Sequence, residues 1–296
     1  MTKEFLVLTA PPGAGVLRDD LVHQIADIVG DADAPRVLGA AEAVEFGLTK
    51  SDANLQKNVR AHLHDAPVDV NFVPAAERRK KLLVADMEST IIEQECLDEL
   101  AVEFGVQDKM VGITARAMRG ELDFEPALRE RVAMLTGLPV AALHALYDTR
   151  ISLMPGAATL LATLNDRATT CGLVSGGFRF FAEKIAARLN FDRFQCNDLG
   201  IADDRLDGSV VDPILGRTAK ADIMHGWCEA LGLAPTQVLA VGDGSNDLAM
   251  LEAAGMGVAF RAKPAVAAAA RFTVTHGDLT ALLYLQGYAQ SDFVEA

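Results

Sequence analysis

Four short apolar runs constrain the fold of this chain more than any other feature. Each run ends in glycine or polar residues and is followed by a helical pattern; the runs cover residues 81–86, 169–175, 238–242 and 257–260. Strands that alternate with helices form parallel sheets, because each parallel connection needs a crossover that covers one face of the sheet. The pattern predicts an α/β fold with a Rossmann-like, doubly wound parallel sheet. In such sheets, ligands bind beyond the carboxyl ends of the strands.

A long helical insertion separates the first two runs. Apolar side chains recur there at three- and four-residue spacings, over residues 97–104, 124–135 and 140–147. A connection of this length exceeds the usual crossover, so we expect a helical cap inserted at about residues 93–153. A second, smaller insertion at residues 199–212 contains the turn-forming stretch Asp203–Gly208, which predicts a hairpin.

Residues 1–76 differ in pattern from the core expected at residues 77–296. We expect a strand, an amphipathic helix and a second strand, at residues 5–8, 17–29 and 68–73. This segment resembles a small α/β domain of the ACT type, which binds amino acids and would give it a regulatory role. The stretch Pro11–Gly15 lacks the Gly-Lys-Ser/Thr ending of a phosphate-binding loop, so we interpret it as a plain turn.

The composition excludes some partners and compartments. The formal net charge is −14 and the pI is near 4.8, which argues against a nucleic-acid partner but not against a small anionic ligand. The four cysteines form no Cys-x-x-Cys pair, which favours buried reduced thiols over a metal site. The apolar run at residues 5–10 is too short for a signal peptide or a membrane span. We therefore expect a cytoplasmic protein without a membrane partner.

Three strand-end segments carry the residues that can do chemistry. The first run delivers Asp86 and Glu88, the second ends in Ser175 and Gly176, and the third leads into Gly242–Asp247. Each segment is ambiguous alone, because Asp and Ser often cap helices and glycine-rich acidic stretches form surface turns. A hydroxyl and glycines at a helix start also favour a phosphate, since free backbone N–H groups point there. Coincidence is a poor explanation for three such segments at strand ends of one chain.

These segments resemble the haloacid dehalogenase superfamily of phosphohydrolases in their order and spacing. The resemblance implies that Asp86 is the nucleophile and that Ser175 and Lys220 bind the phosphate. It also implies a Mg²⁺ ion, held by the carboxylates of Asp86 and Asp243 and by the backbone carbonyl of Glu88. Without the resemblance, a lone lysine such as Lys220 is more often a surface charge.

The residue types suit this chemistry. A phosphate dianion repels an anionic nucleophile until cations and N–H groups neutralise its charge, and Mg²⁺ prefers oxygen ligands. Asp86 would accept the phosphoryl group, and the residue two positions on would protonate the leaving alkoxide and then deprotonate the attacking water. The superfamily usually has Asp there, whereas this chain has Glu88, which is longer by about 1.5 Å. We retain Glu88 as the acid/base, although the extra length puts its geometry in question.

The cap region carries a narrower resemblance. The stretches Glu93–Leu100 and Phe124–Val132 are similar to the phosphoserine phosphatase family. This implies that Glu95 binds the substrate ammonium and that Arg131 binds its carboxylate through a planar two-pronged donor. The non-functional alternative is that both side chains lie on exposed helix faces. Arg129 is two residues from Arg131, so one of the two arginines must face solvent.

The same resemblance assigns the remaining positions and the reaction. Further substrate contacts are implied for Gly176, Asn246, Met118 and Phe124, and Asp247 would orient Lys220 or a metal-bound water. The implied reaction is the Mg²⁺-dependent hydrolysis of O-phospho-L-serine through an aspartyl-phosphate intermediate, the last step of serine biosynthesis.

Two other functions stay open at this point. The first keeps the covalent chemistry but transfers phosphate to homoserine, or acts on another small phosphomonoester. The second is an amino-acid sensor whose catalysis is weakened by Glu88. The sequence also leaves the oligomeric state open, a homo-oligomer included.

Overall fold

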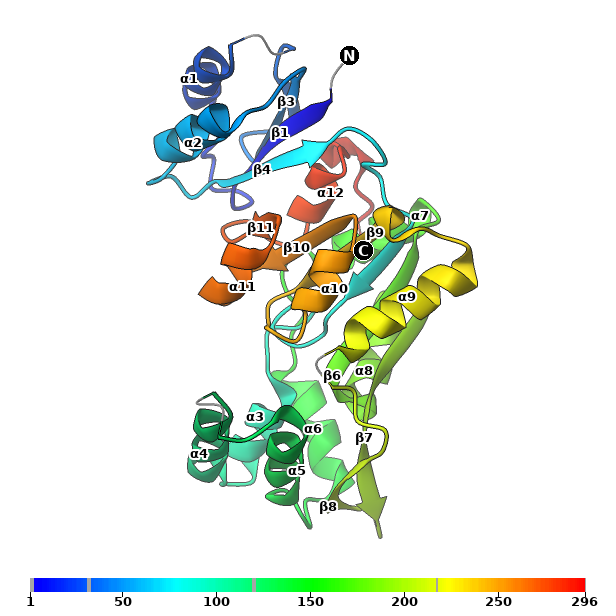
Figure 1. The fold of residues 1–296 in the computed structure, drawn as a ribbon. Helices are drawn as coiled ribbons and strands as arrows, with labels where there is room; N and C mark the ends of the chain where they lie inside the picture. The colour runs from blue at the N-terminus through cyan, green and yellow to red at the C-terminus, as the bar shows by residue number, and fades with distance from the viewer. Residues whose placement is uncertain (1–2, 31–32, 119–120, 217, 296) are drawn as a thin grey trace.

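The chain folds around two separate sheets, with a helical cap at one end (Figure 1). The computed structural model describes residues 3–30, 33–118, 121–216 and 218–295, without the side chains of residues 115, 117 and 118. None of the helices in these ranges is long and apolar enough to cross a membrane. All four cysteines are buried and free, as their spacing predicted.

The first sheet is antiparallel and lies in the N-terminal part of the chain. Its strand order is β2-β3-β1-β4. Two helices connect the strands in a β-α-β-β-α-β sequence, which is the ferredoxin-like arrangement. The elements are β1 (Glu4–Thr9), α1 (Asp19–Val29), β2 (Arg36–Gly39), β3 (Ala43–Leu48), α2 (Ala53–His62) and β4 (Asp69–Pro74). The predicted first strand, helix and last strand are confirmed, whereas β2, β3 and α2 were not predicted.

The second sheet is the predicted doubly wound one. Its order is β11-β10-β9-β5-β6-β7-β8, and every pairing is parallel except that of β7 with β8. Its strands are β5 (Leu82–Ala85), β6 (Thr170–Phe178), β7 (Arg193–Ala202), β8 (Arg205–Val211), β9 (Val238–Gly242), β10 (Met256–Phe260) and β11 (Phe272–Val274). The four apolar runs correspond to β5, β6, β9 and β10, so the predicted fold class is confirmed.

Helices cover both faces of this sheet because its strands are apolar on both sides. In β5, Leu82 and Val84 pack with α9, α10 and α11, whereas Leu83 and Ala85 pack with α7, α8 and α12 on the other face. Alternate residues of a strand point to opposite faces, which explains the continuous apolar run. These helices are α7 (Ala157–Asp166), α8 (Arg179–Leu189), α9 (Ala219–Leu231), α10 (Leu248–Ala253), α11 (Pro264–Ala269) and α12 (Ala281–Leu285).

The cap lies beyond the carboxyl ends of the core strands (Figure 1). It consists of α3 (Cys96–Glu103), α4 (Gln107–Met118), α5 (Phe124–Ala133) and α6 (Val140–Arg150), of which α4 was not predicted. The predicted hairpin is confirmed as the antiparallel pair β7–β8, but its first strand begins earlier than expected, at Arg193, as part of the core sheet. The hairpin reaches the cap, where Leu206 exchanges backbone hydrogen bonds with Gly137 and Leu138.

Candidate active site

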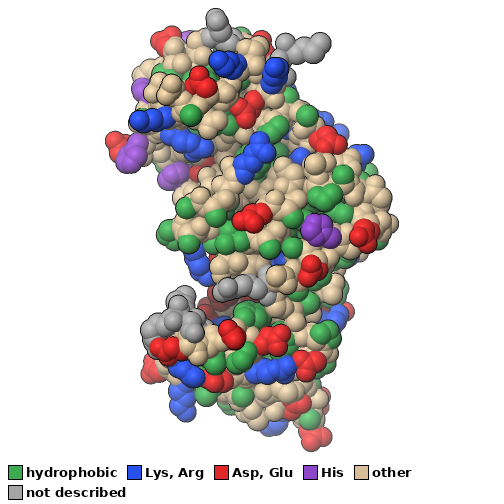
Figure 2. Space-filling model, viewed as in Figure 1, with side chains coloured by type: hydrophobic (Ala, Val, Ile, Leu, Met, Phe, Trp, Pro, Cys, Tyr) green, Lys and Arg blue, Asp and Glu red, His purple; other side chains and the backbone are tan. Residues whose placement is uncertain are grey.

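The three chemical segments meet at one edge of the core sheet. Asp86 follows β5, Asp243 follows β9, and Ser175 lies within β6. Because β9, β5 and β6 are adjacent and parallel, their carboxyl ends lie side by side. A cleft of about 240 Å³ opens there between the core and the cap, and Figure 2 shows the recess between these two parts.

Residues from both parts line this cleft. The core contributes strand-end loops, and the cap contributes the start of α3 and one face of α5. The lining residues are Asp86, Glu88, Glu95, Leu97, Phe124, Leu128, Arg131, Gly176, Gly177, Phe178, Asp243, Gly244, Ser245, Asn246 and Lys263. The sequence therefore predicted most of the polar wall, whereas Lys263, in the loop before α11, carried no recognisable signal.

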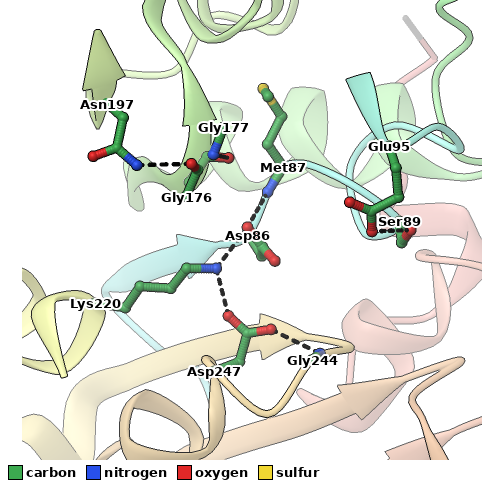
Figure 3. Close-up of polar contacts among 11 residues, drawn as sticks. Asp86, Met87, Ser89, Glu95, Gly176, Gly177, Asn197, Lys220, Gly244 and Asp247 are labelled. Carbon is green, nitrogen blue, oxygen red and sulfur yellow. Dashed lines mark hydrogen bonds and ion pairs between the residues drawn. The ribbon is translucent and has the colours of Figure 1, made fainter. Parts of the chain in front are cut away.

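A buried lysine joins two of the acids (Figure 3). Lys220, the second residue of α9, places its Nζ 2.7 Å from Asp86 Oδ1 and 2.6 Å from Asp247 Oδ1. Asp86 Oδ1 also accepts the Met87 N–H at 2.8 Å, and Asp247 Oδ2 accepts the Gly244 N–H at 2.9 Å. These contacts fix both carboxylates and leave the lysine little freedom, since all three charged side chains are buried.

Three acids surround this lysine, and their charge is not balanced. Carboxylate oxygens of Asp86, Asp243 and Asp247 lie within 4.8 Å of one another. Burial, followed by repulsion from Asp247, raises the pKa of Asp86 well above its usual value, and the same two causes raise the pKa of Asp243 to about 6. Hard oxygen donors with excess negative charge are the ligand set that a Mg²⁺-like cation needs. The site therefore fits a divalent metal ion, and Asp247 belongs to the acid cluster while it also contacts Lys220.

Glu88 points to the cap. Its Oε1 accepts the backbone N–H of Cys96 at 2.7 Å, which is the first residue of α3. Burial, followed by the nearby charge of Glu95, raises the pKa of Glu88 to about 7. A Cβ atom on Gly177 would lie 2.7 Å from Glu88 Oε2, so a larger residue there would displace the Glu88 carboxyl group. Helix α3 thus orients the carboxyl group whose geometry the sequence left in question.

Ser175 and Gly176 lie at the end of the second core strand. Ser175 is buried, and its Oγ accepts the Gly177 N–H at 2.9 Å. Gly176 and Gly177 line the cleft, whereas Ser175 does not, and Lys220 lies next to it through its contact with Asp86. Asn197 of β7 donates its Nδ2 to the Gly176 carbonyl at 2.7 Å (Figure 3). No strand-end pattern marks Asn197, and sequence reasoning missed it.

The cap distinguishes the two candidate arginines. Arg131 of α5 lines the cleft, and its Nη2 donates to Asp98 at 2.6 Å. Its Nε is buried and has no hydrogen-bond partner among the residues that the structure describes. Arg129 turns away to the β7–β8 hairpin, where it contacts Asp212 at 2.5 Å. The inward position therefore belongs to Arg131.

The remaining predicted residues lie around the cleft mouth or outside the described part. Glu95 is the residue before α3, and its Oε1 accepts the Ser89 hydroxyl at 2.9 Å. Phe124 begins α5, and Asn246 follows β9; both line the cleft. The side chain of Met118, the last residue of α4, lies outside the described residues.

The chain is similar in sequence to known proteins. A model of the haloacid dehalogenase-like hydrolases matches residues 83–252. The phosphoserine phosphatase SerB2 of Mycobacterium tuberculosis is 42% identical over 258 residues, which cover 87% of this chain and 61% of that protein. The probable phosphoserine phosphatase of Schizosaccharomyces pombe is 37% identical over 275 residues, 91% of this chain and 92% of that one.

Solved structures agree with these relatives. A phospho-aspartyl intermediate analogue of phosphoserine phosphatase is 35% identical with a TM-score of 0.65, and the match covers 70% of this chain and 98% of that one. This chain spans about three fifths of the length of the Mycobacterium relative but nearly all of the Schizosaccharomyces one. By its family model, its relatives and its fold, the chain belongs to the haloacid dehalogenase-like hydrolases and, within them, to the phosphoserine phosphatase family.

Proposed function

We propose that this chain is a Mg²⁺-dependent phosphatase that hydrolyses O-phospho-L-serine to L-serine and phosphate. One observation carries the proposal: a single cleft joins the Asp86–Lys220 pair of the core to Glu95 and Arg131 of the cap. The first pair suits a phosphoryl group, and the second suits the ammonium and carboxylate of an amino acid. The named relatives are phosphoserine phosphatases, which supports the same substrate.

Asp86 is the nucleophile in this proposal. Lys220 Nζ and the Met87 N–H both contact Asp86 Oδ1. We therefore assign the attack on phosphorus to Oδ2. The new bond joins Oδ2 to phosphorus while the ester bond between phosphorus and the serine oxygen breaks in line. Lys220 holds Asp86 in place during the attack. The phospho-aspartyl analogue of the solved relative supports this covalent step.

Glu88 moves the proton in both half-reactions. Its carboxyl group first gives a proton to the leaving serine alkoxide. The resulting carboxylate then takes a proton from water, whose oxygen attacks phosphorus and releases phosphate from Asp86. The Cys96 N–H keeps this side chain directed to the cleft, which supports the assignment despite its extra methylene.

The acid cluster supports the choice of metal. Asp86, Asp243 and Asp247, with the backbone carbonyl of Glu88, would hold Mg²⁺. When bound, the ion neutralises phosphate charge and so lowers the repulsion between the substrate and an anionic nucleophile. Gly176 and Asn246, which line the same cleft, complete the phosphate subsite.

The cap residues give the substrate preference. Glu95 attracts the ammonium group, and the guanidinium group of Arg131 binds the carboxylate. Phe124 closes the apolar side of the cleft. In the cell this activity would complete serine biosynthesis in the cytoplasm, and residues 1–76 would act as a regulatory domain on the core at 77–296.

Phosphate release from a small panel tests the proposal. The substrates are O-phospho-L-serine, O-phosphoethanolamine without the carboxylate, and 3-phosphooxypropanoate without the ammonium, each with Mg²⁺ or with EDTA. We expect release to require Mg²⁺ and to favour phosphoserine at least about tenfold over the other two. Equal rates for all three substrates would contradict the substrate assignment. Phosphohomoserine formed when homoserine is added would instead identify a phosphotransferase.

A further inference from the structure

Ser89 adopts an unusual backbone conformation beside the active site. Its φ is +54°, in the left-handed region that non-glycine residues seldom occupy. The residues on either side of Ser89 fix this turn. The N–H groups of Ile91 and Ile92 both donate to the Met87 carbonyl, and both isoleucine side chains are fully buried. Strain of this kind persists where the surrounding structure imposes it, and it gathers at functional sites.

The side chain of Ser89 contacts a residue of the cap and not its own turn. Its Oγ donates to Glu95 Oε1 at 2.9 Å, from the loop after β5 to the residue before α3 (Figure 3). Glu95 makes no side-chain capping bond to α3, so its own helix does not fix the carboxylate. Among the described residues, the Ser89 hydroxyl is the group that donates a hydrogen bond to the Glu95 carboxylate.

Glu95 needs such a donor because a second carboxylate is close. Glu88 and Glu95 both line the cleft, and two carboxylates in one cleft repel each other. Repulsion alone would turn the exposed Glu95 side chain away from the cleft and into solvent. A hydrogen bond from a hydroxyl held by a rigid turn opposes that movement.

We propose that Ser89 is a positioning residue for substrate specificity, which holds the Glu95 carboxylate at the place where the substrate ammonium binds. This inference rests on the proposed phosphoserine phosphatase function. It assigns to Ser89 no contact with the phosphate or the metal. The unusual backbone of residue 89 is then the means by which the loop after Asp86 directs the hydroxyl to the cap.

Replacing the hydroxyl tests the proposal in the full-length chain. For Ser89→Ala we expect the KM for O-phospho-L-serine to rise about tenfold, as for the loss of a hydrogen bond to a charged group. The kcat should stay within about twofold, and kcat/KM for 3-phosphooxypropanoate, which lacks the ammonium, should not change. Ser89→Gly removes the hydroxyl and also relieves the backbone strain. Its KM for O-phospho-L-serine should equal that of Ser89→Ala.

A matched control lies on the same side of the cap. Ser152 Oγ donates to Glu93 Oε2 at 2.6 Å and accepts from Gln94 Nε2 at 2.8 Å, so Ser152→Ala removes a serine–glutamate hydrogen bond, and this second bond with it, at residues that do not line the cleft. This variant should keep the wild-type KM for both substrates. Equal losses for both substrates in Ser89→Ala would overturn the proposal, and so would a wild-type KM in Ser89→Gly.

A double-mutant cycle separates this inference from the function on which it rests. In a Glu95→Gln background, Ser89→Ala should add almost nothing, because both changes act on one subsite. A further tenfold loss there would show that Ser89 does not act through Glu95. If the wild-type chain released no phosphate from phosphoserine, the proposed function would fail and not the role of Ser89.

Discussion

Three buried acids face one buried lysine at the site, and this imbalance gives Asp86 its properties. Since burial and Asp247 raise the pKa of Asp86, the folded state disfavours its ionised form when no metal is bound. For Asp86→Asn we expect phosphate release to fall about a thousandfold or more, because the amide cannot attack phosphorus. The thermal midpoint in EDTA should be unchanged or higher, because a repulsive charge is removed. Lost activity together with a lower midpoint would point to unfolding and not to a missing nucleophile.

Glu88 allows a second prediction at this scale. Glu88→Gln keeps the length that reaches the Cys96 N–H but cannot transfer a proton, so kcat should fall by about 10²–10⁴. Glu88→Asp keeps the carboxyl group but draws it away from α3, and a loss of about tenfold is expected. Steady-state kinetics on phosphoserine measures both. The control is Glu93→Gln, an exposed acid outside the cleft. Near-normal kcat in Glu88→Gln would assign proton transfer to another group.

The sequence could predict residue types at strand ends but not every contact. Asp86 and Asp243 were predictable because a strand end fixes where the next residue lies. The residue pattern alone did not decide between Arg129 and Arg131, because Arg129 is held away by Asp212, distant in the chain; the family resemblance indicated Arg131, which lines the cleft. Asn197 was missed for the same reason, since its partner is a backbone carbonyl of a neighbouring strand.

The strands that could be predicted from the sequence are those that a single apolar pattern identifies. The core strands β5, β6, β9 and β10 are buried on both faces and show continuous apolar runs. Strand β3 is as buried but contains Glu45, whose charge is offset by Arg36 and Arg78 from other segments. That compensation cannot be read from local periodicity. Strand β11 has three residues, too few to establish an alternation.

The β7–β8 hairpin joins the core sheet to the cap and carries a prediction about α5. Gly208 of β8 has a φ of +86°, and an added Cβ would lie 2.1 Å from Thr136 Oγ1, just after α5. Gly208→Ala should lower the free energy of unfolding by about 2–3 kcal/mol, through backbone strain and this clash. Because α5 also carries Arg131, the KM for phosphoserine should rise. Denaturant unfolding and steady-state kinetics measure the two effects.

A second glycine separates the strain from the clash. Gly232, after α9, has a φ of +64° and nothing within 4 Å of an added Cβ. Gly232→Ala should therefore lower the free energy of unfolding by only about 1 kcal/mol and leave the KM unchanged. Equal losses in the two variants would mean that the hairpin does not support the cap through this contact.

The whole molecule depends on how the N-terminal sheet joins the core. Asp69 of β4 accepts backbone N–H groups of Thr275, His276 and Gly277, at 2.7–3.2 Å, in the segment between β11 and α12. Asn71 of the same strand exchanges two hydrogen bonds with Thr273 of β11. Because these groups are largely buried, the two parts should unfold together.

Asp69→Asn tests this cooperativity. The new NH₂ group would face backbone donors, so we expect the free energy of unfolding to fall by about 1–3 kcal/mol. Trp227, the single tryptophan, lies on α9, so its fluorescence reports the unfolding of the core. Far-UV circular dichroism reports the unfolding of both parts. The two transitions should coincide in the wild type and separate in Asp69→Asn, with the N-terminal part unfolding first. Asp65→Asn, with a fully exposed side chain, should change neither transition. Coincident, unshifted transitions in Asp69→Asn would mean that other contacts, such as Arg78 with Glu45, hold the two parts together.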